Sequence, residues 1–186
     1  MAGLLQQIAL HKPEVAGPIA EIVGQVQAIA QVHGMQVGSS GLLNLAEVIE
    51  AITASVQRTF GRAIRFGVPD EAVRRWMLPE NESIPIALTI NELLTNAVKH
   101  SAAGLDGSVA CTLELLADGV RIRITNRATL PDAFSLQRIP GGVSGLGLVR
   151  ALLPRRHATL AIEQTGADVT TTIELARPVV ARADAA

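Results

Sequence analysis

The stretch NELLTNAVKHS, residues 91–101, carries four polar side chains at a spacing that could do chemistry. Because an α-helix turns by about 100° per residue, these side chains fall within one arc about 100° wide. They are Glu92, Asn96, Lys99 and His100. Apolar residues fill the opposite side of the predicted helix, namely Ile86, Ala87, Ile90, Leu93, Leu94, Ala97 and Val98.

Together these residue types suit a phosphate and its cation. An Asn amide offers a neutral oxygen to a hard cation, and a Lys ammonium meets phosphate as a compact charge. A Glu carboxylate can orient a group or accept a proton. A polar stripe of this kind often only faces solvent. Here the chain has just two lysines beside fourteen arginines, and Asn is a poor helix former, so a pocket wall is favoured.

A glycine-rich turn supplies a second part of such a pocket. In GGVSGLGL, residues 141–148, Gly145 and Gly147 open a predicted short helix. Backbone N–H groups at the positive end of a helix dipole can approach phosphate oxygens closely. The residues just before this turn, 127–143, have no sustained period and are predicted to form a loop.

These two stretches resemble the N box and the G2 box of the ATP-binding fold that sensor histidine kinases share with gyrase, Hsp90 and MutL. The resemblance spans residues 45–175 and implies a Bergerat-type α/β sandwich that binds ATP with Mg²⁺. By resemblance, Asn96 is the magnesium ligand and Glu92 a catalytic glutamate that acts as a base. Lys99, also catalytic, and His100 would face the phosphates and ribose. The implied phosphate-contacting turn and base-side threonine are Ser144, Gly145, Leu146, Gly147 and Thr170.

The sequence departs from this pattern at two positions. The strand before the loop alternates Val120, Ile122 and Ile124, and this parity puts Asn126 where the family has its adenine-reading Asp. An Asn oxygen can accept a hydrogen bond from the adenine amino group, but without a charge the bond is weaker. Val143 replaces the first glycine of the lid motif.

The front of the chain predicts a helical hairpin. Apolar residues recur at helical spacing over residues 13–36, and residues 1–12 resemble the end of a preceding helix. His33 falls on the apolar side and is expected in the core. The hairpin resembles the dimerisation helices of one histidine kinase subfamily, in which the phosphoaccepting His would lie upstream of this chain. The resemblance implies a homodimer through these helices and a response-regulator receiver domain as partner.

The rest of the chain alternates strands with helices, which indicates an α+β two-layer sandwich. Asn44, with Glu47 three residues later, is predicted to cap a helix that runs to about Phe60. The long helix is expected to open at Ser83 and Pro85, and residues 177–186 to fray. Strands are expected at 62–69, 72–79, 108–116, 120–126, 157–164 and 168–176, with a short helix at 145–154. The predicted units are a partial dimerisation and phosphotransfer hairpin at 1–40, an ATP-binding domain at 41–180 and a tail at 181–186.

Composition narrows the function classes. The net charge is −1, which gives no basic surface for nucleic acid. No apolar run reaches the roughly 18 residues of a membrane span, and no signal peptide opens the chain. The single Cys111 lies in an alternating apolar run and is expected to be a reduced core thiol. We therefore expect a cytoplasmic domain without membrane contact, in a parent protein that could be anchored.

The expected function is the ATP-binding catalytic region of a two-component histidine kinase, which passes the γ-phosphate to a histidine and then to a response-regulator aspartate. Two alternatives stay open. One is an anti-sigma-factor serine kinase of the same superfamily, although such kinases begin close to the first strand and lack the hairpin. The other is a degenerate, non-catalytic dimerisation or phosphotransfer module, which Asn126 and Val143 favour.

Overall fold

The computed structural model describes residues 13–37, 41–102, 108–143 and 145–183. Its main sheet has five strands in the order β2-β4-β5-β7-β6. β2 pairs in parallel with β4, and the other neighbours pair antiparallel. The strands are β2 (Ile64–Gly67), β4 (Val109–Leu116), β5 (Gly119–Arg127), β6 (Ala158–Thr165) and β7 (Asp168–Ala176). Each lies within two residues of the bounds of a predicted strand, and β2 shows the largest difference.

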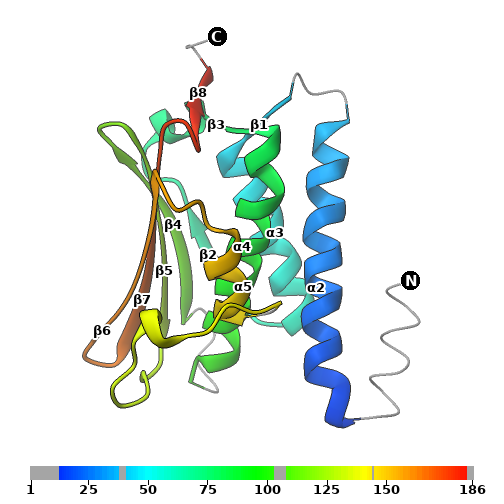
Figure 1. The fold of residues 1–186 in the computed structure, drawn as a ribbon, viewed down its shortest axis with the longest axis vertical. Coiled ribbons are helices and arrows are strands. Elements are labelled where there is room, and N and C mark those ends of the chain that lie inside the picture. Colours follow the sequence, from blue (N-terminus) through cyan, green and yellow to red (C-terminus); the bar gives the residue numbers. More distant parts are fainter. Residues whose placement is uncertain (1–12, 38–40, 103–107, 144, 184–186) are drawn as a thin grey trace.

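Helices cover one face of this sheet (Figure 1). They are α3 (Leu45–Phe60), α4 (Glu80–His100) and α5 (Gly145–Leu152). A fourth helix, α2 (Pro13–Gln36), packs against α3 and α4 on the side away from the sheet (Figure 1). The predicted α+β sandwich of helices on a sheet, preceded by a helix, is confirmed. The first arm of the predicted hairpin, residues 1–12, lies outside the described residues.

The core between α4 and the sheet follows the predicted apolar pattern. All seven predicted apolar positions of α4 are buried, at 0–7% exposure. Asn44 caps α3, because its side-chain oxygen accepts a hydrogen bond from the Glu47 N–H at 3.2 Å. Cys111 is fully buried, as expected, and burial raises the pKa of its thiol to about 12 because the thiolate is poorly solvated there.

α4 begins at Glu80, before the predicted start at Ser83 and Pro85. One feature favours the earlier start. Glu80 and Glu82 place negative charge in the first turn, where the helix dipole favours it. Pro85 consequently lies inside the helix, in its second turn, where it removes the hydrogen bond that an N–H would donate to the Asn81 carbonyl.

A small second sheet corrects the prediction of a frayed tail. β1 (Leu42–Asn44), β3 (Trp76–Pro79) and β8 (Ala181–Arg182) form it in the order β1-β3-β8. Val179 and Val180, just before β8, are 4% and 0% exposed, so this end of the chain packs into the core. The strand predicted at residues 72–79 is half right, since its first part forms a 3₁₀ helix (Glu71–Arg75).

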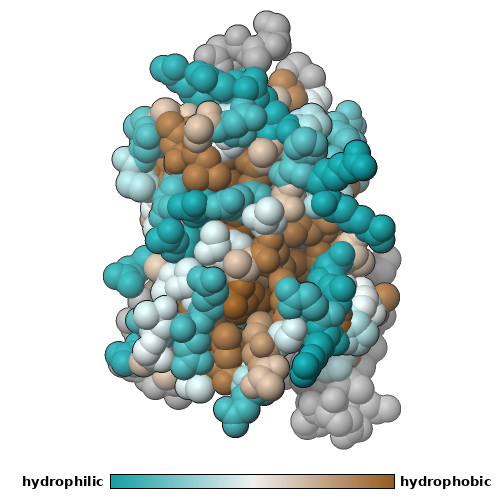
Figure 2. All heavy atoms as spheres, turned by 60° about the vertical axis from the view of Figure 1, so that its left-hand side comes forward, coloured by the Kyte–Doolittle hydropathy of each residue, from teal (hydrophilic) through white to brown (hydrophobic). Residues whose placement is uncertain are grey.

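The surface has two apolar features. α2 leaves Ile22 and Val26 about half exposed, and His33 is exposed on the same helix rather than buried in the core as predicted. The edge strand β6 keeps Leu160 and Ile162 only half-buried. Figure 2, with the sheet side turned forward, shows apolar surface in the middle of that face between hydrophilic side chains. Within the described ranges, no helix combines the length and the apolarity needed to cross a membrane.

Candidate functional site

A cavity of about 420 Å³ opens between α4, the β5–β7–β6 part of the sheet, α5 and the loop that precedes α5. This volume is within the usual range for small-molecule sites. Its lining is mostly apolar, with five polar side chains among the described residues. The lining residues are Leu93, Asn96, Ala97, His100, Asn126, Ala128, Thr129, Leu130, Pro131, Phe134, Ile139, Leu146, Ile162, Val169 and Thr171.

Polar side chains in the cavity are free to meet a ligand. Asn126 is 5% exposed and Thr171 is 9% exposed, yet neither side chain hydrogen-bonds to any described residue. Asn96 and His100 also make no side-chain hydrogen bond within the described part of the chain. The polar atoms of these four side chains are not among the fully enclosed, unpartnered atoms of the described residues, so they remain reachable from the cavity. The cavity therefore combines apolar walls with polar groups that a ligand could satisfy.

The predicted polar arc of α4 is divided between two neighbours. Relative to Glu92, helical geometry places Lys99 at about −20°, Asn96 at about 40° and His100 at about 80°. The structure follows this order. Asn96 and His100 line the cavity, whereas Glu92 and Lys99 contact α2. The helical spacing alone predicts all four side chains in one pocket, whereas only Asn96 and His100 line it.

Glu92 joins α2 to the glycine-rich turn. Its side chain is 2% exposed, and Oε1 accepts a hydrogen bond from Gln25 Nε2 at 3.0 Å. Oε2 accepts another from the backbone N–H of Gly145 at 2.7 Å. Gln25 Nε2 also donates to the carbonyl oxygen of Val143, at 3.3 Å. The Glu92 carboxylate thus already accepts a hydrogen bond from one of the backbone N–H groups that are predicted to contact phosphate.

Lys99 is paired in a similar way. Its Nζ lies 2.6 Å from Glu21 Oε1, and the two side chains are 27% and 29% exposed. Glu21 and Gln25 are one helical turn apart on α2, so they lie on the same face of that helix. From this face Gln25 contacts Glu92 and Glu21 contacts Lys99. Neither Glu21 nor Gln25 belongs to the predicted site, although their spacing is that of a continuous polar face of the helix.

The turn that opens α5 needs its glycines. Gly145 has a φ of +59°, in the left-handed region that favours glycine. A Cβ on Gly147 would lie 2.8 Å from Gly142 N and 2.9 Å from Pro140 O, which is too close for the backbone to remain in place. Leu146 lines the cavity, whereas Ser144 lies outside the described residues. Val143 is 87% exposed.

Thr170, the threonine predicted to lie near the base, is not among the residues that line this cavity. In the pairing of β5 with β7, Thr170 is opposite Thr125, and Asn126 is opposite Val169. Side chains alternate faces along a strand, so Val169 and Thr171 share the face of Asn126, and both line the cavity. Thr170 points to the other face of the sheet. The neighbouring Thr171 is the threonine that this cavity offers to a ligand.

The donor set fits a cation that arrives with a ligand rather than a resident metal. Among the described residues, no group of three His, Cys, Asp or Glu side chains could hold a metal ion. Asn96 offers one unpartnered amide oxygen, while the carboxylate of Glu92 is already hydrogen-bonded. Mg²⁺ commonly takes one or two protein ligands and completes its shell with phosphate oxygens and water.

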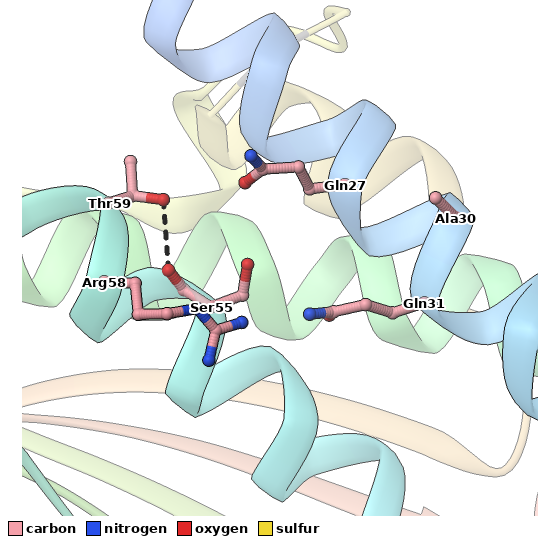
Figure 3. Close-up of a pocket in the computed structure, with 6 residues that line it drawn as sticks. All are labelled: Gln27, Ala30, Gln31, Ser55, Arg58 and Thr59. Atoms are coloured by element: carbon pink, nitrogen blue, oxygen red, sulfur yellow. Dashed lines mark hydrogen bonds between the residues drawn. The ribbon is translucent and has the colours of Figure 1, made fainter. Parts of the chain in front are cut away.

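A second hollow, of about 550 Å³, lies between α2 and α3. Figure 3 shows side chains of the two helices facing each other across it, with the Gln31 amide directed toward Ser55. Its lining residues are Gln27, Ala30, Gln31, Ser55, Arg58 and Thr59. None of the side chains predicted to do chemistry lies in this groove, so the cavity beside α4 is the candidate site.

The fold is that of histidine kinase catalytic domains. The histidine kinase domain of the Erythrobacter litoralis EL346 blue-light activated histidine kinase is 18% identical, with a TM-score of 0.68, over 92% of this chain and 82% of that chain. In a longer structure of that kinase the match covers 48% of that chain. The catalytic domain of histidine kinase ThkA is 18% identical, with a TM-score of 0.55, over 73% of this chain and 94% of that chain.

A structure described as a bacterial phosphotransferase is also similar. It is 12% identical, with a TM-score of 0.50, over 93% of this chain and 86% of that chain. No protein-family model matches the chain, and no curated protein matches it significantly in sequence. At these identities the likeness establishes the fold, and function has to be argued from the site.

Proposed function

We propose that the chain binds ATP with Mg²⁺ in the cavity beside α4 and serves as the ATP-binding catalytic region of a sensor histidine kinase. The observation that carries this proposal is the convergence of unpartnered Asn96, His100 and Asn126 on one largely apolar cavity, next to the glycine turn at Gly145. A purine needs flat apolar walls with few polar groups, and its phosphates need N–H groups and a cation. The histidine kinase fold supports the same function.

Each part of the nucleotide has a proposed place. The base lies toward Asn126 and Thr171, and the phosphates lie toward the N–H groups of the turn that opens α5. Asn96 would hold Mg²⁺, which supplies charge neutralisation for phosphoryl transfer. The protein's remaining contribution is to position the reacting groups. The transition state of phosphoryl transfer is loose, so the protein needs to do little covalent chemistry.

Catalysis requires two of the α2 contacts to open. Lys99 is proposed to meet the phosphates, which it can do only after leaving Glu21. Glu92 is proposed to assist the acceptor imidazole as a base, so its carboxylate must leave Gln25 and the Gly145 N–H. The γ-phosphate would pass to a histidine outside the described residues and then to an aspartate on a response-regulator receiver domain.

The proposed assembly is a cytoplasmic homodimer through α2. Ile22 and Val26 are 49% and 47% exposed, and their spacing of four residues places them on one face of the helix. Burying such side chains against a second copy is favourable. We assign residues 1–40 to dimerisation and phosphotransfer, and residues 41–180 to nucleotide binding.

Isothermal titration calorimetry of ATP, with and without Mg²⁺, tests the proposal. We expect saturable binding that Mg²⁺ strengthens, and a reduced Mg²⁺ effect in Asn96→Ala. Asn81→Ala is a matched control, because Asn81 is an exposed asparagine at the other end of α4. Absence of heat with any adenine nucleotide at millimolar concentration contradicts the proposal.

Absence of binding favours a second function, a phosphotransfer module without nucleotide. Two observations support that alternative. The groups expected to face phosphate are engaged by α2 or by Glu92, and the similar structures include one described as a phosphotransferase. Such a module would carry phosphate between a histidine and a receiver domain with the cavity empty. Phosphate transfer from a phosphorylated receiver domain to this chain, with no ATP present, would identify it.

A further inference from the structure

At the end of the cavity formed by β5 and β7, none of the described lining residues selects an amino group over a carbonyl. Asn126 at the end of β5 and Thr171 on β7 are its two buried polar residues, at 5% and 9% exposure. No Asp or Glu occurs among the described residues that line the cavity. The polar contacts available to a base there come from an amide and a hydroxyl.

Amides and hydroxyls differ from carboxylates in what they accept. An ionised carboxylate only accepts hydrogen bonds, so it favours the 6-amino group of adenine and opposes a carbonyl in the same place. An amide carries an oxygen that accepts and a nitrogen that donates, and a hydroxyl does both through one atom. Either group can therefore face an amino group or a carbonyl.

The orientation of the Asn126 amide is not fixed by the protein. Its side chain makes no hydrogen bond to any described residue, so turning the amide over breaks no contact within them. The side chain opposite it on β7, Val169, is apolar and offers no competing partner. The hydroxyl of Thr171 can rotate in the same way, because it too lacks a partner in the described part of the chain.

Resting on the function proposed above, we infer that this site accepts nucleotides with a 6-oxo purine about as well as ATP. With a 6-oxo base, the Asn126 nitrogen donates to the carbonyl at position 6. With adenine, the Asn126 oxygen accepts from the amino group. The selectivity of the pocket is thus set at residue 126, and an Asp there would restore a preference for adenine.

Inosine triphosphate is the diagnostic probe, because its base differs from adenine in carrying the carbonyl at position 6 and a proton on the adjoining nitrogen. We expect the full chain to bind Mg-ITP and Mg-ATP with dissociation constants within tenfold of each other in calorimetry. In Asn126→Asp the ratio of Kd(ITP) to Kd(ATP) should rise at least about fivefold. A buried acceptor facing another acceptor loses a hydrogen bond without compensation, which corresponds to roughly 5- to 150-fold in affinity.

Asn81→Asp is the matched control, since it makes the same chemical change on an exposed residue far along α4 from the cavity. Its ratio should equal that of the unchanged chain. If Asn126→Asp does not fold, Asn126→Ala is tested in its place. It should weaken the binding of both nucleotides and leave the ratio of Kd(ITP) to Kd(ATP) unchanged.

Two results overturn the inference while leaving the proposed function intact. One is ATP binding more than tenfold tighter than ITP in the unchanged chain. The other is a folded Asn126→Asp or Asn126→Ala variant with both affinities unaltered. Binding of neither nucleotide would instead remove the proposed function, and the inference with it.

Discussion

The ion pair between α2 and α4 predicts that Glu21→Gln tightens nucleotide binding. The change keeps the size of the side chain and removes its charge. In the structure Lys99 Nζ lies 2.6 Å from Glu21 Oε1, and Lys99 can meet a phosphate only after this pair separates. Breaking the Lys99–Glu21 pair costs free energy, and this cost makes the free energy of nucleotide binding less favourable.

The size of the effect follows from exposure. Since the two side chains are 27% and 29% exposed, the pair is partly screened by solvent. Pairs of this kind contribute about 0.2–1 kcal/mol. Removing the pair should lower the Kd for Mg-ATP by about 1.5- to 5-fold. High salt should shrink the difference, because it screens the pair in the unchanged chain.

Calorimetry at low and high salt measures this effect, with thermal unfolding as a check on folding. Glu50→Gln on α3 is the control, because Glu50 is exposed and makes no ion pair within the described residues. In a Lys99→Met background Glu21→Gln should have little effect. An affinity that is unchanged or weaker in Glu21→Gln alone would refute the reasoning, as would equal tightening in the Lys99→Met background.

Three further changes have expected outcomes. Asn96→Ala should abolish the Mg²⁺-dependent part of ATP affinity in calorimetry, and unchanged Mg²⁺ dependence would refute the ligand assignment. Gly147→Ala puts a Cβ 2.8 Å from Gly142 N, so it should destabilise the chain by about 1–3 kcal/mol in denaturant unfolding. Gly34→Ala, where a Cβ meets nothing within 4 Å, is its control and should stabilise by about 0.5–1 kcal/mol. Ile22→Asp should raise the dimer dissociation constant at least tenfold in analytical ultracentrifugation; a monomeric unchanged chain would contradict the proposed dimer.

Local pattern was enough to predict most of the fold. The seven apolar positions of α4 recur with a helical period, and all are buried. Asn44 caps α3 through a hydrogen bond with the Glu47 N–H, three residues away, so the cap depends only on local sequence. The strand β8 was missed because it is two residues long and exists only by pairing with β3. Nothing local in ARADAA distinguishes such a strand from a tail.

The polar residues of α4 could be predicted from the sequence, but the elements that pack against them could not. Helical spacing brought Glu92 and Asn96 into one arc, but it could not show that α2 covers one edge of that arc and the cavity meets the other. Thr170 lies in a run of three threonines, so the residue types do not indicate which of them faces the cavity. The pairing of β7 with β5 decides that Thr171 faces the cavity.

The central claim is that nucleotide binds in the cavity beside α4, and an NMR titration of ¹⁵N-labelled chain with Mg-ATP tests it most directly. The account predicts the largest amide shifts at His100, Asn126 and Gly147. Shifts confined to the groove between α2 and α3, at Gln27, Gln31 and Thr59, would place the ligand elsewhere and contradict it.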